Sequence, residues 1–440
     1  MDPAAASVFA PRFGYIPGMR RVLLLMSTTT YRAGAFLDAA RRIGIPVTVG
    51  SERAQALEWA NPVGHLTLDI TDARRSLPAI EDFARGCPVG AVLAADDDGA
   101  ELAARAAHVL GLAHHPVTAV AATRDKHRMR ERFAAAGLPT PRFERVSTAD
   151  DTGAIAARIH FPCVVKPLWL GASRGVTRAD TPAELERALE RVAHLLRAER
   201  GRTGFPRDAE PVLIEDYLPG VEVALEGLVT AGRMRTLALF DKPDPLEGPY
   251  FEETIYVTPS RLPRLTQHAI EQRAGDMAAA LGLAHGPVHA ELRVNDHGVW
   301  PLEIAPRSIG GLCSRALRFA GGASLEELIL RHALGMPGAD AEREREASGV
   351  MMIPIPRAGT LRAVAGVAEA RRVPDIEDVR ITIPIGDSLV PLPEGSRYLG
   401  FIFARGLSPG RVEDALRSAH RLLTFEVEPS GADPREAGRT

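Results

Sequence analysis

The stretch at residues 289–307 reads HAELRVNDHGVWPLEIAPR and holds two apolar runs on either side of a polar turn. The turn contains Asn, Asp and Gly, the residues that let a chain reverse between two antiparallel strands. A hairpin folded symmetrically about His297 places Glu291 opposite Glu303, with both carboxylates on one face. Because facing carboxylates repel each other and lose hydration, a divalent cation between them is the simplest arrangement. The alternative is that one carboxylate pairs with an arginine and the other stays solvated.

The segment that follows this hairpin, residues 305–311, reads APRSIGG. Arg307 stands directly beside the predicted metal carboxylates, and Gly310 and Gly311 allow the backbone to approach a ligand closely. An arginine in this place suits the stabilisation of a transferring phosphoryl group or of another developing negative charge. The alternative is that Arg307 only pairs with one of the two glutamates.

A lysine and a small-residue loop lie upstream of the hairpin. Lys166 ends an apolar run at residues 163–166, and the loop at residues 171–176 reads GASRGV. Small residues let backbone N–H groups approach phosphate oxygens, and a nearby ammonium neutralises their charge. The alternative is a surface hairpin with a lysine that reaches into solvent. The loop is not a P-loop, because the G-x-x-x-x-G-K-[ST] pattern is absent.

Residues 212–222, VLIEDYLPGVE, form an apolar strand that ends in a bend. A strand end offers an adenine ring backbone donors and acceptors beside an apolar wall. Glu222, seven residues after Glu215, could accept hydrogen bonds from ribose hydroxyls. The alternative is a strand that leads into an acidic turn.

The N-terminal part alternates strands and helices. The strands are expected at residues 22–26, 46–49, 66–70 and 89–93, and the helices at 33–43, 73–84 and 100–110. This alternation predicts a parallel, Rossmann-like layer, but no G-x-G-x-x-G follows the first strand, which disfavours dinucleotide binding. The triplet Asp96-Asp97-Asp98 could bind a metal, but we favour a polar loop that caps the next helix.

The rest of the chain divides into further segments by the same reasoning. Helices are expected at residues 125–136, 152–159, 182–196, 263–281 and 411–422. Strands are expected at residues 163–166, 212–215, 381–385 and 398–403, and residues 221–304 are expected to be mainly strands. An exposed loop is expected at residues 197–207 and a linker at residues 339–349. The predicted domains are a flexible leader (1–19), a Rossmann-like domain (20–117), a central domain (118–338) with a lid (about 140–215), and a C-terminal domain (350–430).

Composition narrows the class of protein. The 440 residues suggest about three domains, and 45% apolar with 25% charged residues is ordinary globular usage. A net charge of −3 argues against nucleic acid or an anionic membrane as the main partner. Cys87, Cys163 and Cys313 have no metal-ligand spacing, and three scattered cysteines fit a reducing compartment. Without a signal peptide or a long apolar run, we predict a cytoplasmic protein.

Taken in order, these motifs resemble those of an ATP-grasp ligase. They are Asp125-Lys126, Lys166, the loop at 171–175, Glu215 with its bend, Glu222, Glu291, Glu303 and Arg307. Within that superfamily the chain resembles the L-amino acid ligases, on the basis of His289 two residues before Glu291 and of the segments IPIPRAG (353–359) and RYLGFIFARG (397–406). The resemblance implies an α/β ATP-grasp fold with an N-terminal Rossmann-like (pre-ATP-grasp) domain and a small α+β C-terminal domain.

The resemblance also implies roles for individual residues. The phosphates of ATP would be held by Lys126 and Lys166, and the lid loop would consist of Gly171, Ala172, Ser173, Gly175 and Val176. Adenine would be framed by Glu215, Asp216, Tyr217 and Leu218, and ribose would be bound by Glu222. Mg²⁺ would be held by Glu291 and Glu303, and the reacting carbonyl would be stabilised by Arg307 with Gly310 and Gly311. Two Mg²⁺ ions are expected, with Mn²⁺ as an alternative. Many ATP-grasp enzymes have Asn where this chain has Ala305, which cannot ligate a metal.

The expected substrate contacts lie between and beside these motifs. Lys242 would meet an amino acid's carboxylate, and Glu252 and Glu253 its ammonium, although a loop salt bridge explains them equally well. His289 is a base, a substrate contact or a structural residue, and Ser308 is expected to contact the substrate.

The implied reaction is an ATP-dependent ligation. A carboxylate, that of an amino acid or a related compound, is activated as an acyl phosphate and condensed with an amine to an amide or dipeptide, releasing ADP and phosphate. The partners are then small amino-acid substrates and, as in many relatives, a second copy of the chain in a homodimer. The alternatives are a carboxylating enzyme that uses bicarbonate and a non-catalytic ATP-binding module.

Overall fold

The computed structural model describes residues 20–28, 30–53, 63–199, 211–337 and 341–429. The predicted leader, residues 1–19, lies outside the described residues, as do residues 200–207 of the predicted surface loop. The first residues of that loop belong instead to helix α7 (Pro182–Glu199). No helix in these described ranges is both long and apolar enough to cross a membrane.

A parallel four-stranded sheet forms the N-terminal layer, in the order β3-β2-β1-β4. Its strands are β1 (Arg21–Leu25), β2 (Val47–Ser51), β3 (His65–Thr67) and β4 (Val89–Ala94), and its helices are α1 (Ala33–Arg42), α2 (Ala73–Gly86) and α3 (Ala100–Val109). Strand β1 is buried along its whole length, which explains its continuous apolar run. The predicted Rossmann-like layer is confirmed, although β3 ends at Thr67, three residues before the end of the predicted strand 66–70.

The region predicted to be a lid folds as a second, antiparallel sheet in the order β5-β8-β6-β7, and it is called the lid below. Its strands are β5 (Phe143–Ser147), β6 (Cys163–Pro167), β7 (Thr177–Ala179) and β8 (Pro211–Asp216), with helices α6 (Thr152–Ala156) and α7. Helices α4 (Val117–Thr123) and α5 (Lys126–Ala135) connect it to the N-terminal layer. Asp125 caps α5 by accepting two backbone N–H groups of the first turn.

An antiparallel eight-stranded sheet forms the centre, in the order β13-β12-β9-β10-β11-β14-β18-β16. The strands are β9 (Val221–Thr230), β10 (Arg233–Asp241), β11 (Ile255–Thr258), β12 (Gly286–Asn295), β13 (Gly298–Ala305), β14 (Ala347–Ile353), β16 (Ile376–Ile381) and β18 (Gly400–Gly406). The prediction of a linker at 339–349 is wrong for its last residues, because β14 begins at Ala347 and is fully buried. The C-terminal strands β14, β18 and β16 therefore continue the central sheet.

The remaining C-terminal elements cover one end of this sheet. A small sheet, in the order β17-β15-β19, consists of β15 (Gly359–Ala365), β17 (Ser388–Leu389) and β19 (Thr424–Glu428), beside helices α10 (Val367–Ala370) and α11 (Pro409–Arg421). The strand predicted at 381–385 is wrong, since β16 ends at Ile381. The other helical elements are α8 (Arg264–Leu281), α9 (Leu325–Ala333), η2 (Asp97–Gly99), η3 (Cys313–Ala316) and η4 (Ala320–Gly322).

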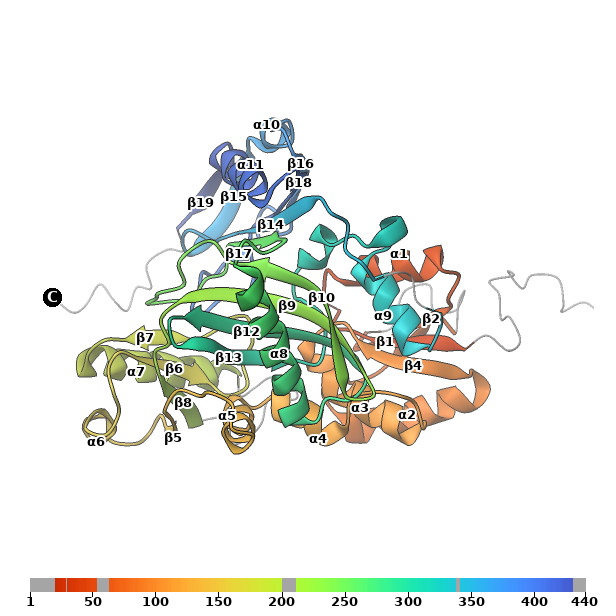
Figure 1. The fold of residues 1–440 in the computed structure, drawn as a ribbon, viewed down its shortest axis with the longest axis horizontal. Helices are drawn as coiled ribbons and strands as arrows, with labels where there is room; N and C mark the ends of the chain where they lie inside the picture. Colours follow the sequence, from red (N-terminus) through yellow and green to blue (C-terminus); the bar gives the residue numbers. More distant parts are fainter. Residues whose placement is uncertain (1–19, 29, 54–62, 200–210, 338–340, 430–440) are drawn as a thin grey trace, which may run out of the picture.

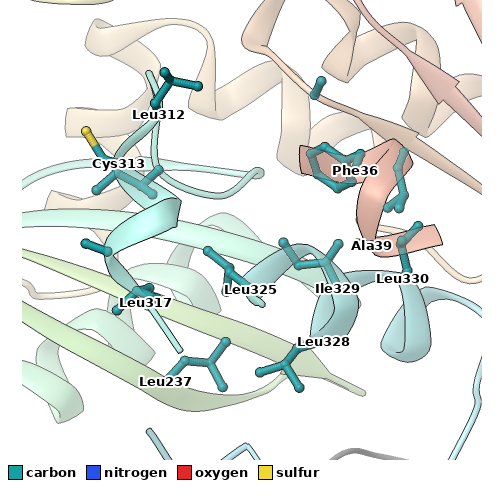
Figure 2. Close-up of a cluster of buried hydrophobic side chains, with 14 of the residues drawn as sticks. Phe36, Ala39, Leu237, Leu312, Cys313, Leu317, Leu325, Leu328, Ile329 and Leu330 are labelled. Atoms are coloured by element: carbon teal, nitrogen blue, oxygen red, sulfur yellow. The ribbon is translucent and has the colours of Figure 1, made fainter. Parts of the chain in front are cut away.

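The N-terminal layer, the lid and the C-terminal elements surround the central sheet on different sides (Figure 1). One cluster of buried apolar side chains joins the N-terminal layer to the central sheet, and its members include Phe36, Leu237, Leu330, Met352 and Phe401. Figure 2 shows Phe36 and Ala39 of α1 facing side chains of α9. Because each large apolar side chain buried here contributes about 1.5–3 kcal/mol, this shared core fixes the N-terminal layer against the sheet.

Candidate active site

A cleft of about 2150 Å³ lies where the N-terminal layer, the lid, the central sheet and the C-terminal elements meet. The predicted site residues that line it are Lys126, Lys166, Gly171, Ala172, Ser173, Val176, Glu215, Asp216, Tyr217, Leu218, Glu222, Glu253, His289, Glu291, Glu303, Arg307, Gly310 and Gly311. Four predicted residues are not part of the lining, namely Gly175, Lys242, Glu252 and Ser308. The fold therefore gathers most of the predicted residues from distant parts of the sequence.

Strands β12 and β13 form the predicted hairpin, and Glu291 pairs with Glu303 as expected. The turn is not centred where the sequence suggested, because Asn295 pairs with Gly298. A regular ladder from that turn would bring Leu302 opposite Glu291. A one-residue bulge next to Glu291 skips Leu302 and restores the pairing of the carboxylates.

Three carboxylates converge around one lysine. The side-chain oxygens of Glu222, Glu253 and Glu291 lie within 4.8 Å of one another. Lys242 Nζ donates to all three, at 2.7 Å to Glu222, at 3.1 Å to Glu291 and more closely to Glu253. Burial alone would lower the pKa of Lys242, but the carboxylates outweigh it and raise the pKa well above its usual value. The salt-bridge alternative is thus the observed state of Lys242 and Glu253, and Glu252 lies outside the cleft.

Burial and repulsion act together on one member of this group. Burial, with the neighbouring charges of Glu291 and Glu222, raises the pKa of Glu253 to about 7 although Lys242 opposes the shift. Burial and the two neighbouring carboxylates thus favour the protonated form of Glu253 more than in a free glutamate.

The facing carboxylates of the hairpin are the predicted ligands of a divalent cation. Glu303 is not part of the three-carboxylate group, and its Oε2 lies 3.5 Å from Lys126 Nζ. Glu291 belongs to the group and shares a hairpin face with Glu303. In nucleotide sites Mg²⁺ is held by one or two carboxylates together with phosphate oxygens of the substrate, and Glu291 and Glu303 offer carboxylates of that type. Ala305 is buried and offers no side-chain ligand.

Glu215 is a structural anchor at the predicted adenine end of the cleft. Its side chain is only 3% exposed and accepts hydrogen bonds from Arg130 Nε at 2.8 Å and Nη2 at 3.2 Å. Lys166 Nζ also donates to it. Burial alone would raise the pKa of Glu215, but Arg130 and Lys166 outweigh it and lower the pKa to about 2. Its carboxylate thus holds Lys166 in place at the cleft wall.

The small-residue loop has an unusual backbone. Ala172 and Ser173 both have φ of 55°, in the left-handed region, and Gly175 has φ of 71°. A left-handed conformation costs a residue with a Cβ about 1–2 kcal/mol. Two consecutive residues in this conformation therefore indicate a strained loop, and such strain clusters at functional sites. Backbone turns of this kind point successive N–H groups into one concavity and bind anions. Lys126 Nζ donates to Leu170 O at 2.8 Å and fixes the start of the loop.

The C-terminal elements hold this loop. Gly175 N donates to Pro393 O at 2.8 Å, and Arg174 Nε donates to Glu394 O at 3.0 Å. Arg174 also pairs with Glu199 of the lid helix at 2.7 Å. Gly175 therefore anchors the loop rather than lining the cleft.

Aromatic and guanidinium groups stack beyond the strand end at Asp216. The Arg178 guanidinium lies 4.2 Å from the centre of the Tyr217 ring, and that of Arg293 lies 5.4 Å from it. Arg293 Nη1 donates to Leu218 O at 2.6 Å, and Nε donates to Glu222 Oε2 at 3.1 Å. The Glu222 carboxylate, expected to bind ribose, is thus shared by Arg293 and a lysine.

His289 belongs to a buried relay of polar groups. Its Nδ1 is hydrogen-bonded to Glu226 Oε1, and its Nε2 lies 3.4 Å from Glu291 Oε1. The other oxygen of Glu226 accepts the Ile309 N–H at 3.0 Å. Burial alone would lower the pKa of His289, but Glu226 and Glu291 outweigh it and raise the pKa to about 9. His289 is therefore a cation that links the hairpin to the Gly-rich segment after it.

Arg307 pairs with neither glutamate of the hairpin. Its Nε donates to Asp97 Oδ1 at 3.1 Å, and its Nη2 donates to Asp97 Oδ2 at 2.8 Å. The capping prediction for the acidic triplet is therefore wrong, because neither η2 nor α3 has a side-chain cap. Ser308 is 2% exposed and bonded to Arg32, so its predicted contact with substrate is wrong in this structure.

Four residues that shape the site were not predicted as site residues from the sequence, namely Asp97, Arg130, Glu226 and Arg293. Glu226 and Arg293 are buried on adjacent strands, where Glu226 contacts His289 and Arg293 contacts Glu222. A charged residue among buried apolar strand positions indicates a buried partner, and that signal could be read from the sequence. Arg130 lies on a helix rich in charge and gave no such signal. The role of Asp97 gave no local signal, because its partner Arg307 lies 210 residues away.

Comparison with known proteins agrees with this architecture. Three family models match in order: an ATP-grasp N-terminal domain at residues 37–114, an ATP-grasp domain at 159–316 and an L-amino acid ligase C-terminal domain 2 at 351–428. A formate-dependent phosphoribosylglycinamide formyltransferase of Dechloromonas aromatica is 31% identical over 312 residues, 67% of this chain and 68% of that protein. The chain belongs to the ATP-grasp family.

Other ATP-grasp relatives are more distant or match less of the chain. An alanine–anticapsin ligase of Bacillus subtilis is 29% identical over 230 residues, 50% of this chain and 46% of that ligase. The chain thus spans about half of that curated relative's length. The crystal structure of an L-amino acid ligase from Bacillus licheniformis superposes with a TM-score of 0.80 at 25% identity, covering 93% of this chain and 99% of that one. This ATP-grasp chain is therefore similar in fold to an L-amino acid ligase over 93% of its length.

Proposed function

We propose that this protein is an ATP-dependent ligase that joins an amino-acid carboxylate to an amine, forming an amide or dipeptide with release of ADP and phosphate. The observation that carries the proposal is the C-terminal segment matched by the L-amino acid ligase model. Met352, Thr382 and Tyr398 of that segment line the same cleft as the predicted nucleotide residues. The segment matched by the L-amino acid ligase model, residues 351–428, thus contributes side chains to the cleft.

The first step is the activation of the substrate carboxylate, which is a poor electrophile. A carboxylate resists attack by an amine, so the γ-phosphoryl group of ATP is first transferred to it. Lys126, Lys166 and the loop at 171–176 would bind the phosphates, with Lys166 oriented by its buried partner Glu215. Glu291 and Glu303 would hold Mg²⁺, which supplies neutralisation of the phosphate charge when bound.

The second step is attack of the amine on the acyl phosphate. Arg307 lines the cleft beside Gly310 and Gly311, and its guanidinium is oriented by a carboxylate. Fixed donors of this kind stabilise the negative charge that develops on the carbonyl oxygen. The lid loop, held by the C-terminal elements, would exclude the water that hydrolyses an acyl phosphate.

Substrate recognition is proposed for residues at the floor of the cleft. Glu253 and His289 line it, whereas Lys242 lies behind them and neutralises their carboxylate neighbours. In this proposal Glu253 meets the substrate ammonium, and Lys242 sets the charge of the group rather than binding the substrate carboxylate.

A coupled ADP-release assay tests the function. The full chain is incubated with Mg²⁺ and ATP, and with pairs of amino acids, with bicarbonate or without a further substrate, and products are identified by mass spectrometry. ADP release that depends on amino acids, with an amide of the summed mass minus water, is expected. Release stimulated only by bicarbonate would favour a carboxylating enzyme, and tight ATP binding without release would favour a non-catalytic module.

A further inference from the structure

The acidic loop after β4 reaches across the cleft to the arginine of the ligation step. Asp97 engages Arg307 through two parallel hydrogen bonds, at 3.1 Å and 2.8 Å, and the two side chains are 26% and 16% exposed. A bidentate pair of this kind fixes the guanidinium plane as well as its position. Asp97 of the N-terminal layer thus determines the orientation of Arg307, which follows strand β13 of the central sheet.

The pair also determines which donors of Arg307 face a ligand. A guanidinium has five N–H donors. Asp97 takes one from Nε and one from Nη2, and Ser308 O takes one from Nη1 at 3.1 Å. Two N–H groups are left, one on each terminal nitrogen. The three occupied donors hold the guanidinium in one orientation, and two N–H groups remain for a ligand.

Glu303 is a second carboxylate that acts on Arg307 electrostatically. Burial alone would lower the pKa of Arg307, but Asp97, and more weakly Glu303, outweigh it and raise the pKa above its usual value. Glu303 is thus a competing anionic partner within electrostatic reach. Without Asp97, the guanidinium would be free to turn toward Glu303.

Asp97 is itself held between the N-terminal layer and the lid. Arg124 Nη1 lies 3.8 Å from its Oδ1. A Cβ placed on Gly171 would lie 3.8 Å from its Oδ2, so the carboxylate reaches the lid loop. The residue stands where three parts of the cleft meet.

We infer that Asp97 is a positioning residue, which orients the Arg307 guanidinium for attack of the amine on the acyl phosphate. The inference rests on the proposed function of Arg307 and deepens it. Asp97 does not touch the reacting atoms in this scheme and acts only through its partner.

Asp97→Asn in the full chain tests the inference, with the ligation assay above as readout. The variant keeps the size of the side chain and loses its charge. The kcat for amide formation is expected to fall about 10- to 100-fold, while the KM for ATP stays within about twofold because the phosphate residues are untouched. The fraction of ADP released without amide is expected to rise. An unchanged kcat in the folded variant would overturn the inference.

A double-mutant cycle separates positioning through Arg307 from a general structural effect. If Asp97 acts only through Arg307, the double variant D97N/R307Q has the same kcat as R307Q alone, within about twofold. Losses that multiply would contradict the inference. Asp98→Asn is the matched control: this neighbour is 57% exposed and lies 3.7 Å from Arg124, and its replacement is expected to change kcat less than threefold. An equal loss in D98N and D97N would contradict the inference as well.

Two further measurements distinguish a failure of this inference from unfolding of the variant and from a failure of the proposed function. Thermal unfolding establishes that each variant is folded, and if D97N is not, Asp97→Glu replaces it and is expected to lose kcat through a displaced charge. Wild type that makes no amide with any amino-acid pair contradicts the proposed function itself. Wild type that ligates while the Asp97 variants keep its kcat contradicts only this inference.

Discussion

At the scale of single residues, the site depends on buried charges that have partners on every side. Glu215 receives hydrogen bonds from Arg130 and Lys166 and is almost fully buried. Its low pKa means that it contributes stability above pH 4.5, which is lost as the pH falls through about 2. Removing one member of such a group leaves the others charged and unpaired, which costs more than the group gains when intact.

Glu215→Ala is therefore expected to lower the free energy of unfolding by about 3–5 kcal/mol, because Arg130 and Lys166 lose their common partner. Chemical denaturation at pH 7 measures it. Glu144→Ala breaks a surface pair whose side chains are 44% and 37% exposed, and is expected to cost less than about 1 kcal/mol. Similar losses in the two variants would contradict the importance assigned to burial.

The proposed metal carboxylates give a second prediction at this scale. Glu303→Gln keeps the shape of the side chain and removes a ligand charge, so turnover is expected to fall at least about 100-fold with unfolding unchanged. Steady-state ligation and thermal unfolding are the measurements. Asp296→Asn, exposed at the turn of the same hairpin, serves as the control. Full activity in the Glu303 variant would exclude the metal assignment.

At the scale of elements, the lid loop is a separate unit whose shape depends on its neighbours. Its left-handed residues Ala172 and Ser173 store backbone strain. The contacts of Arg174 and Gly175 with residues 393–394 hold the strained loop from the C-terminal side. The loop and the C-terminal elements are therefore expected to respond together to mutation.

Arg174→Ala removes the contacts with Glu394 O and with Glu199. The KM for ATP is expected to rise about tenfold, since one charge-assisted hydrogen bond is worth about 1.5–3 kcal/mol. Initial rates at varied ATP measure the effect. The surface variant Arg158→Ala on the same lid is the comparison, with an unchanged KM expected. A KM for ATP that is equal in both variants would show that the C-terminal contact does not shape the loop.

At the scale of the whole molecule, histidines lie where the N-terminal layer meets the central sheet. His115 Nδ1 accepts the backbone N–H groups of Ala284 and His285, and its Nε2 contacts Pro287 O. The rings of His285 and His332 stack with centres 4.2 Å apart. Burial lowers the pKa of His115 to about 3 and that of His332 to about 4, so this junction holds neutral imidazoles.

The junction predicts a loss of stability in mild acid. The unfolded chain protonates His115 near pH 6.5, whereas the native chain keeps it neutral to about pH 3. Its contribution is therefore complete above pH 6.5 and declines as the pH falls, by about 1.4 kcal/mol per pH unit. His115→Gln keeps an acceptor and a donor and does not titrate. The fall in unfolding free energy between pH 7.5 and 5 is expected to be about 2 kcal/mol smaller in this variant. Equal falls in both proteins, measured by chemical denaturation, would contradict the prediction.

Contacts between residues close in the sequence could be predicted, whereas contacts between distant parts of the chain could not. The Glu291–Glu303 pairing was predictable because a hairpin is local, even though a bulge had to correct an off-centre turn. Lys166 and the loop at 171–176 were predictable for the same reason. Ser308 was not, because its hydroxyl meets Arg32 from the N-terminal layer, and that contact depends on how two distant parts pack.

The sequence by itself determined the alternation of elements, the Rossmann-like layer and the order of the nucleotide motifs, since periodicity and turn residues act within a few positions. Only the tertiary structure decided that strands β14, β18 and β16 extend the central sheet, and that Asp97 holds Arg307. Strand order and long-range ion pairs depend on which faces pack together. That choice is made by the free energy of the whole core and not by any local pattern.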